Sequence, residues 1–216
     1  MFNPSYTGPR QDILRLVPEG VSRVLDVGFS VGTLGQAIRE RDGAEVVGVE
    51  LDERMAEEAR GRLNAVHVAN VEDEALIGRL GEAPFDCIIF ADLLEHLVDP
   101  WTALSRYVER LAPDGVVVAS LPNIRHYTTI RTLLFSGYWP YRDRGIHDRT
   151  HLRFFTLRNV RELFASAGLT IREVDRNYRL IERPHRLNRL APAFAWPGLR
   201  ELIAFQYLVQ AGRGRR

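Results

Sequence analysis

Short apolar runs alternate with longer segments of helical spacing along most of the chain. Seven apolar runs predict strands, and they lie at residues 23–27, 44–49, 65–69, 85–90, 116–120, 169–174 and 205–211. Helices are expected between them at residues 11–16, 33–40, 53–63 and 102–111, and in a further segment that Thr156 opens and Gly168 closes. This alternation is typical of an α/β fold, in which helices cover both faces of a parallel sheet.

The most informative pattern joins the first two strands. Asp26 lies in the first strand, which runs into a turn that holds Gly28 and Gly32. Glycines in such a turn can adopt positive φ and leave the backbone open to a ligand. The second strand ends at Glu50, 22 residues after Gly28, where an acidic residue can bind ribose hydroxyls. The sequence therefore predicts a nucleoside-binding crevice at the carboxyl ends of these strands.

The spacing of this turn argues against a dinucleotide. A dinucleotide site requires glycines at two positions where this chain has Ser30 and Thr33. Asp26 would repel a pyrophosphate, whereas it would attract the amino group and the sulfonium of S-adenosylmethionine. We therefore expect S-adenosylmethionine as the cofactor. The alternative is a structural glycine turn in which Asp26 caps the following helix.

Length and composition predict one domain with a sizeable core. The chain has 216 residues, of which 45% are hydrophobic and 26% are charged, which is ordinary for a globular protein. No apolar stretch approaches the roughly 20 residues that a transmembrane helix needs, and the N-terminus lacks a signal-peptide pattern. Cys87 is the single cysteine, and we expect it in the core of a strand. These features predict a cytoplasmic location.

Charge is divided unevenly along the chain. Residues 1–141 hold 13 arginines and 21 acidic residues, whereas residues 142–216 hold 16 arginines and 7 acidic residues. A basic C-terminal third can steer anionic partners, although solvated helix faces explain the arginines equally well.

Two segments depart from the regular alternation. Residues 138–151 are dense in aromatic, Arg and His side chains without a clear period, so we expect a loop there. The Arg- and Pro-rich segment before the last strand is longer than an ordinary connection. We therefore expect a single domain over residues 1–216, with a lid-like loop around 136–155 and an insertion around 176–204.

Four segments carry a resemblance to a known family: residues 24–35, 46–52, 90–100, and the run G-I-H-D-R-T-H-L-R-F-F-T at 145–156. Over roughly residues 6 to 175 the chain resembles class I S-adenosylmethionine-dependent methyltransferases. It is most similar to the bacterial group often found beside or fused to glycosyltransferases. The resemblance implies a doubly wound, Rossmann-like sheet of seven strands, mostly parallel with an antiparallel last strand. It also implies methyl transfer from the cofactor sulfonium to an acceptor.

The crevice and the resemblance together assign the cofactor contacts. We expect Glu50 to accept from the ribose hydroxyls, Asn70 and Val71 to flank the adenine, and Arg10 to pair with the cofactor carboxylate. The family usually has Cys where this chain has Phe29, which would narrow the turn, and an acid where it has Asn70. The expected contacts are Tyr6, Arg10, Asp26, Gly28, Ser30, Gly32, Glu50, Leu51, Asn70, Val71 and Asp92.

Two histidines are the candidate catalytic bases. Asp92, Glu95 and His96 stand at positions i, i+3 and i+4, and on a helix they would share one face. In that arrangement Glu95 could orient His96 as a general base, the three could hold a divalent cation, or they could be structural. His151 in the narrow 145–156 motif is the second candidate base, and its alternative is a packed structural role.

Three further residues lie where an acceptor could bind. Asn123 follows the fifth strand, and His147 and Asp148 belong to the lid-like loop. We assign them to substrate binding.

The expected reaction is O-methylation of a sugar or small-molecule hydroxyl, so the partner would be a small-molecule or glycan acceptor. A lipophilic, quinone-like acceptor is an alternative, as is a binding module that keeps the cofactor without turnover. Nucleic acid is disfavoured, because the chain has no N-P-P-Y-type motif and no aromatic stacking platform among its arginines.

Overall fold

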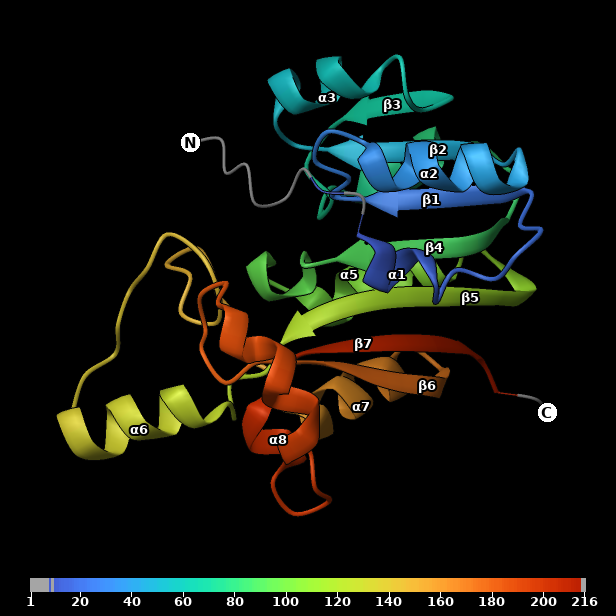
Figure 1. Cartoon of the computed structure of the whole chain (residues 1–216). Coiled ribbons are helices and arrows are strands. Elements are labelled where there is room, and N and C mark those ends of the chain that lie inside the picture. The colour runs from blue at the N-terminus through green and yellow to red at the C-terminus, as the bar shows by residue number, and fades with distance from the viewer. Residues whose placement is uncertain (1–7, 9, 215–216) are drawn as a thin grey trace.

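Seven strands form one sheet in the order β3-β2-β1-β4-β5-β7-β6 in the computed structural model, which describes residue 8 and residues 10–214 (Figure 1). The strands are β1 (Arg23–Val27), β2 (Glu45–Glu50), β3 (Ala65–Val68), β4 (Phe85–Ala91), β5 (Leu111–Pro122), β6 (Leu169–Tyr178) and β7 (Ala204–Arg213). The α-helices are α1 (Gln11–Leu14), α2 (Thr33–Asp42), α3 (Glu53–Ala59), α4 (Glu74–Arg79), α5 (Pro100–Val108), α6 (Tyr127–Ser136), α7 (Leu157–Ser166) and α8 (Arg200–Ile203). Two 3-10 helices are η2 (Leu94–His96) and η3 (Arg186–Phe194).

The pairing of the strands confirms the predicted fold class. Strands β1 to β5 pair in parallel, whereas β7 runs antiparallel to both of its neighbours, β5 and β6. The chain reverses its direction of winding between β1 and β4, so the carboxyl ends of these two strands diverge into a crevice. Crevices of this kind are the usual ligand sites of open α/β sheets.

Alternate strand residues supply a core on each face of the sheet. Leu25 and Phe90 belong to the core that α4, α5 and α7 cover, whereas Val24 and Ile89 belong to the core that α1, α2 and α3 cover. Figure 1 shows α1 and α2 in front of the sheet and α5 and α7 behind it. Cys87 lies in the second core, fully buried and without a disulfide partner, as expected.

Local capping signals in the sequence are used as predicted. The Asp52 carboxylate accepts from the backbone N–H groups of Arg54 and Met55 and so begins α3. Thr156 begins α7 in a reciprocal capping box with Asn159.

Several boundaries and helices differ from the expected ones. α3 ends at Ala59, four residues before the predicted end, and β5 begins at Leu111, where a helix was expected to finish. The predicted insertion contains η3 and α8, and β6 extends into it as far as Tyr178. α4 was not predicted because its acidic start resembles a loop, although Asp73 caps it.

α6 was missed for a different physical reason. Its buried residues are Thr128 and Thr129, whereas Leu134 and Phe135 are 71% and 80% exposed. A helix whose apolar side chains face outward carries no periodic signal of a core-facing side. Among the described residues, no helix combines the length and the apolar character needed to cross a membrane.

Packing at Gly48 shows how the crevice accommodates Phe29. A Cβ atom on Gly48 would lie 2.6 Å from Cε1 of Phe29 and 2.6 Å from Cδ1 of Leu63. The Phe29 ring therefore rests on the bare backbone of β2, and only 6% of its surface is exposed. Gly48 on the neighbouring strand thus leaves room for the Phe29 ring, so that Phe29 narrows the turn less than expected.

Substitution of Gly48 by Ala tests this packing. We expect Gly48→Ala to lower the free energy of unfolding by about 1–3 kcal/mol, because the added methyl overlaps two buried side chains. Gly61→Ala is the matched control, since a Cβ there meets nothing within 4 Å, and it should change stability by less than about 0.5 kcal/mol. Equal urea midpoints for the two variants would contradict the packing described.

Candidate active site

The glycine turn after β1 adopts the backbone conformation that its sequence predicted. Gly28, Ser30 and Gly32 have φ values of 75°, 57° and 76°. A side chain on Gly28 would approach Leu93 Cδ1 to 3.0 Å, so close packing as well as conformation requires glycine there. Gly32 is the N-cap of α2, which has no side-chain cap. Asp26 therefore does not cap α2, and the alternative in which it would do so is wrong.

The Glu50 carboxylate is held across the turn by backbone donors. Its Oε2 accepts from the N–H of Ser30 at 2.9 Å, and its Oε1 accepts from the N–H groups of Leu51 at 2.8 Å and Asp52 at 3.0 Å. Oε2 accepts one hydrogen bond and retains a lone pair that can accept from a hydroxyl, whereas both lone pairs of Oε1 are used by backbone N–H groups. The carboxylate can therefore accept from a sugar hydroxyl through Oε2, and its contact with ribose stays a prediction.

Asp26 is the most unusual charge in the crevice. It is 1% exposed, and its Oδ2 has no hydrogen-bond partner among the described residues. Burial and the neighbouring Glu50 carboxylate raise the pKa of Asp26 to about 7. A buried acid with an unsatisfied oxygen is costly unless a donor or a cation reaches it. An ammonium or sulfonium ligand would supply that charge.

These groups line one cavity of about 370 Å³, a size within the range of small-molecule sites. Nine of the predicted cofactor contacts line it, namely Arg10, Asp26, Gly28, Ser30, Glu50, Leu51, Asn70, Val71 and Asp92. Gly32 is not among the lining residues, and Tyr6 lies outside the described residues. The Asn70 side-chain oxygen accepts from the N–H of Glu72 at 3.0 Å, and its second lone pair can still accept from an adenine amine.

Arg10 and Asp92 form a wall rather than a free cationic arm. Arg10 Nη1 donates to Asp92 Oδ2 at 2.6 Å, and Arg10 Nε donates to Asp12 Oδ1 at 2.9 Å. Ser120 donates to the other oxygen of Asp92 at 2.8 Å. We expect Arg10 to pair with the cofactor carboxylate, but its guanidinium is already bonded to Asp92 and Asp12. The contact with the cofactor therefore stays a prediction.

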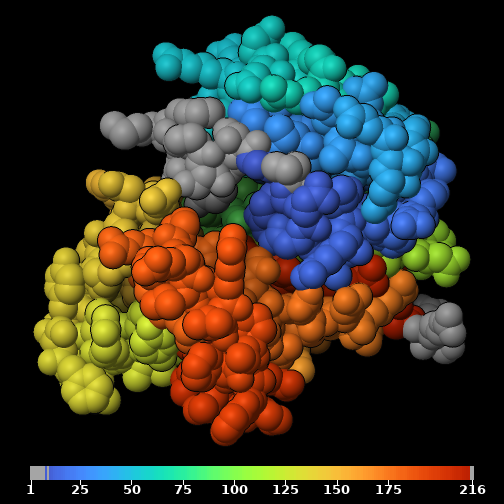
Figure 2. All heavy atoms as spheres, viewed as in Figure 1, coloured from blue at the N-terminus to red at the C-terminus, as the bar shows by residue number. Residues whose placement is uncertain are grey.

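A second cavity of about 720 Å³ lies on the far side of this wall, and Arg10 and Asp92 line both cavities. Its other lining residues come mainly from 142–145 and 177–184, together with Glu95 and His151. In Figure 2 the yellow segment that holds 142–145 and the orange segment that holds 177–184 lie side by side, below the blue N-terminal part. The second cavity is large enough for an acceptor beside the nucleoside crevice.

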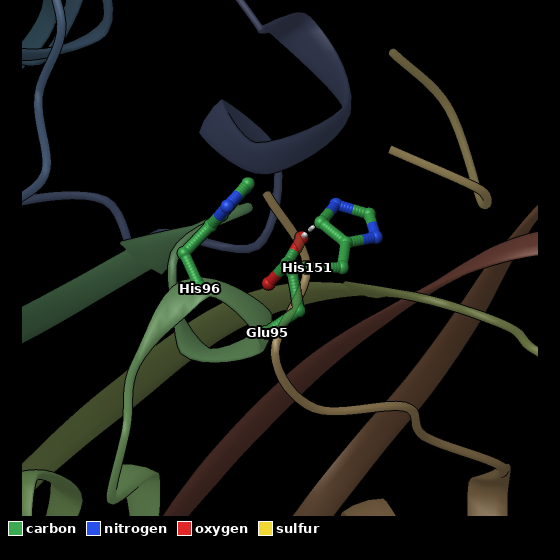
Figure 3. A group of neighbouring side chains, drawn as sticks. All are labelled: Glu95, His96 and His151. Atoms are coloured by element: carbon green, nitrogen blue, oxygen red, sulfur yellow. Dashed lines mark ion pairs between the residues drawn. The ribbon is translucent and has the colours of Figure 1, made fainter. Parts of the chain in front are cut away.

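Glu95, His96 and His151 meet where the two cavities adjoin (Figure 3). His96 lines the first cavity, whereas Glu95 and His151 line the second. The two imidazole rings are 4.7 Å apart in an edge-on arrangement, and His151 Nε2 is 4.0 Å from Glu95 Oε1. One ligand atom from each of the three residues lies within 4.8 Å of the others, so the cluster could also hold a divalent cation.

The local backbone corrects the expected helical face. η2 covers only Leu94–His96, and Asp92 precedes it with a φ of 54°. Asp92 therefore turns toward Arg10, while Glu95 turns toward His151. Residue 151, which is distant in sequence, takes the third place in the cluster.

Backbone carbonyls orient both histidines. His151 Nδ1 is 3.2 Å from the carbonyl oxygen of Ile146, and His96 Nδ1 is 3.3 Å from that of Thr150. A ring N–H at Nδ1 leaves Nε2 as the lone-pair nitrogen. Burial and the nearby His96 lower the pKa of His151 to about 4, and burial lowers that of His96, so both rings are neutral at pH 7.

Glu95 is buried without hydrogen bonds to its carboxyl group. Its side chain is 1% exposed, and neither oxygen has a partner among the described residues. Burial, and then the charge of Asp92, raise the pKa of Glu95 well above its ordinary value. Either a proton or a bound cation would neutralise this carboxylate.

The three predicted substrate residues are buried and line neither cavity. Asn123 Nδ2 donates to the carbonyl oxygens of Glu201 and Ala204, both at 2.7 Å. His147 lies between Thr129 and the Glu182 carboxylate, and Asp148 accepts from Thr150 at 2.7 Å. These contacts hold the 145–151 segment and the start of β7 in place, which is a positioning role.

Sequence reasoning missed the part of the second cavity that the insertion supplies. Arg179, Glu182 and Gln206 line it. For Arg179 the sequence signal was the concentration of arginine in the C-terminal third, which does not say which arginines face a cavity. Glu182 and Gln206 had no such signal.

Comparison with known proteins agrees with this geometry. A family profile described as "Methyltransferase domain" matches residues 6–174. The ubiquinone biosynthesis O-methyltransferase of Neisseria meningitidis is 28% identical over 154 residues, which are 69% of this chain and 64% of that protein. The trans-aconitate 2-methyltransferase of Paracidovorax citrulli is 29% identical over 145 residues, which are 66% of this chain and 55% of that protein. The chain thus spans less than two thirds of the length of these relatives.

Solved structures share the fold. An S-adenosylmethionine-dependent methyltransferase from Archaeoglobus fulgidus matches with a TM-score of 0.65 at 19% identity, covering 96% of each chain. An O-methyltransferase of neocarzinostatin biosynthesis, solved with S-adenosylmethionine and a hydroxy-methyl naphthoic acid, matches with a TM-score of 0.58 at 16% identity. That match covers 95% of this chain and 53% of the other.

Asp26→Asn tests the buried charge. The folded pKa near 7 exceeds the ordinary value of 3.8, so the folded state binds more protons than the unfolded state between these pH values. Asp26 therefore destabilises the free protein progressively as pH rises from about 4 to 7. We expect Asp26→Asn to stabilise the free protein by roughly 2–4 kcal/mol at pH 8 and by little at pH 4.

The same substitution should weaken S-adenosylmethionine binding by about tenfold or more, because a charge-assisted hydrogen bond is lost. Chemical unfolding at both pH values and calorimetric titration provide the two readouts. A variant that is less stable than the wild type at pH 8, or that binds the cofactor as tightly, would contradict this assignment of Asp26.

Proposed function

The chain belongs to the methyltransferase-domain family, and from this premise we propose that it uses S-adenosylmethionine to methylate a hydroxyl oxygen of a small molecule. The observation that carries the proposal is the pair of adjoining cavities with His96 facing one and His151 facing the other, their rings 4.7 Å apart. Donor and acceptor can meet only where these cavities join.

Binding of the cofactor would use the charges and donors of the first cavity. Glu50 would accept from a ribose hydroxyl through Oε2, and Asp26 would face the positive charge of the methionine portion. The cofactor supplies an electrophilic methyl group on its sulfonium. The protein's task is to align the acceptor oxygen with that methyl and to exclude water.

Removal of the hydroxyl proton is the chemical step left to side chains. His151 presents a neutral Nε2 to the acceptor cavity, and its Nδ1 is oriented by the carbonyl of Ile146. His96 presents the same nitrogen at the cofactor side. Either imidazole can accept the proton as methyl transfer proceeds.

The same three side chains fit a divalent cation as the alternative. Glu95 would supply a carboxylate oxygen, and neither of its oxygens has a hydrogen-bond partner among the described residues. Each histidine would supply a ring nitrogen. A cation held there would lower the pKa of a bound hydroxyl and remove the need for a separate base.

Two observations bear on the class of the acceptor. The relatives named for ubiquinone biosynthesis favour a phenolic or quinone-like hydroxyl, and the resemblance of residues 145–156 favours a sugar hydroxyl. A cytoplasmic location and a single domain over the whole chain remain predictions.

Alanine substitutions of His96 and His151 test the chemical step. We expect each to lower kcat by roughly 10²- to 10⁴-fold, the usual contribution of a general base, while the affinity for S-adenosylmethionine is unchanged. His67→Ala is the matched control, because His67 lies on the edge strand β3 and lines neither of the two cavities. Product S-adenosylhomocysteine would be measured with catechol, sugar-nucleotide and hydroxy-acid acceptors.

Treatment with a chelator separates the two chemical roles. If the histidines act as bases, dialysis against EDTA leaves turnover unchanged. If activity disappears and returns with added Mg²⁺, Mn²⁺ or Zn²⁺, the cluster holds a cation instead. Full activity in both histidine variants would remove both roles, and cofactor binding without product from any acceptor would favour a binding module.

A further inference from the structure

Arg179 is an anchored arginine in the acceptor cavity. It follows β6 directly, its backbone N–H donates to the carbonyl of Ile203 at 2.9 Å, and its own carbonyl accepts from His126 Nε2 at 2.8 Å. Its guanidinium carbon lies 4.0 Å from the centre of the Phe205 ring. Backbone bonds and a stacked ring therefore fix this side chain before any ligand arrives.

No carboxylate of the described residues forms an ion pair with Arg179. The polar contact of its guanidinium is one hydrogen bond from Nη1 to the backbone carbonyl of Glu182, at 2.9 Å. The nearby acids raise its pKa, but burial lowers it by more, so the net shift is downward. A half-buried guanidinium without an anionic partner keeps several N–H donors available for a ligand.

The acids that line the same cavity are committed elsewhere. Asp12 and Asp92 bind Arg10, at 2.9 and 2.6 Å. Glu182 forms an ion pair with Arg142. The Arg10 guanidinium is thus shared by two carboxylates and Glu182 is matched by Arg142, and none of the three acids forms an ion pair with Arg179 among the described residues.

Two further acids line the cavity. Asp143 pairs with Arg149, which is not among the residues that line the cavity. Glu95 Oε1 faces His151 instead, at 4.0 Å from its Nε2, and forms no ion pair with Arg179 among the described residues. Arg183 also lines the cavity, and its side chain is in no ion pair among the described residues. Arg179 and Arg183 are thus cavity-lining arginines that have no ion-pair partner among the described residues.

We propose that Arg179, supported by Arg183, binds an oxyanion of the acceptor, so that the enzyme methylates a molecule that carries a carboxylate or a phosphate group. This inference rests on the proposed function, because it assigns the second cavity to the acceptor. Guanidinium groups bind carboxylate and phosphate oxygens through paired N–H donors, which sets orientation as well as affinity. Arg179 and His151 both line this cavity of about 720 Å³, so an oxyanion bound at Arg179 would direct the acceptor hydroxyl toward His151.

The test uses the full chain loaded with S-adenosylhomocysteine and titrated with inorganic phosphate, and separately with acetate, at constant ionic strength. The variants are Arg179→Gln, which can still donate to the Glu182 carbonyl, and Arg179→Lys, which keeps the charge but not the fork. Arg189→Gln is the matched control, because Arg189 is exposed in η3 and does not line the cavity. Melting temperatures and affinity for S-adenosylhomocysteine report whether the fold and the first cavity are intact.

We expect the wild type to bind one oxyanion, and Arg179→Gln to weaken that binding by about tenfold or more. Arg179→Lys should be intermediate, and Arg189→Gln should match the wild type. The stronger of the two anions identifies the group on the acceptor. Absence of anion binding by the wild type, or equal affinity in Arg179→Gln, would overturn the proposal. Failure to bind S-adenosylhomocysteine would instead overturn the proposed function, so the two failures are distinguishable.

Discussion

The structure depends on the presence of two carboxylates in one narrow crevice. Glu50 is compensated by three backbone N–H groups, whereas Asp26 is buried with one oxygen unsatisfied. The protein tolerates this because the crevice is formed by glycine backbone, which leaves space for a ligand to approach both acids. A positively charged nucleoside complements this pattern, and a diphosphate does not. The stability lost at Asp26 is therefore a local cost of ligand recognition.

The second organising feature is the wall between the two cavities. Arg10 and Asp92 form an ion pair, and both residues line the nucleoside crevice and the second cavity, for which we propose the acceptor. His96 lines the first cavity and His151 lines the second, and their rings are 4.7 Å apart. We propose that methyl transfer takes place beside these two rings. Segments from distant parts of the chain thus meet at a single junction, and the insertion before β7 completes the acceptor side.

Much of the fold and about half of the site follow from local sequence. Strand alternation and the glycine turn depend on short-range patterns, so β1, β2, Asp26 and Glu50 were predictable. The failures arise from contacts that spacing does not encode. Asn123 is turned inward by the carbonyls of the segment before β7, and α6 hides its period because its apolar side chains face outward. Arg179 differs from the other arginines only through its tertiary neighbours.

Calorimetric titration of S-adenosylmethionine and NAD into the wild type, Glu50→Ala and Glu45→Ala tests whether the crevice binds a positively charged nucleoside in preference to a diphosphate. Glu45 lies exposed at the opposite end of the same strand, so its substitution controls for general effects on β2. The expectation is that one S-adenosylmethionine binds per chain, that NAD binds more weakly, and that only Glu50→Ala loses affinity for S-adenosylmethionine. Tighter binding of NAD, or unchanged S-adenosylmethionine affinity in Glu50→Ala, would contradict it.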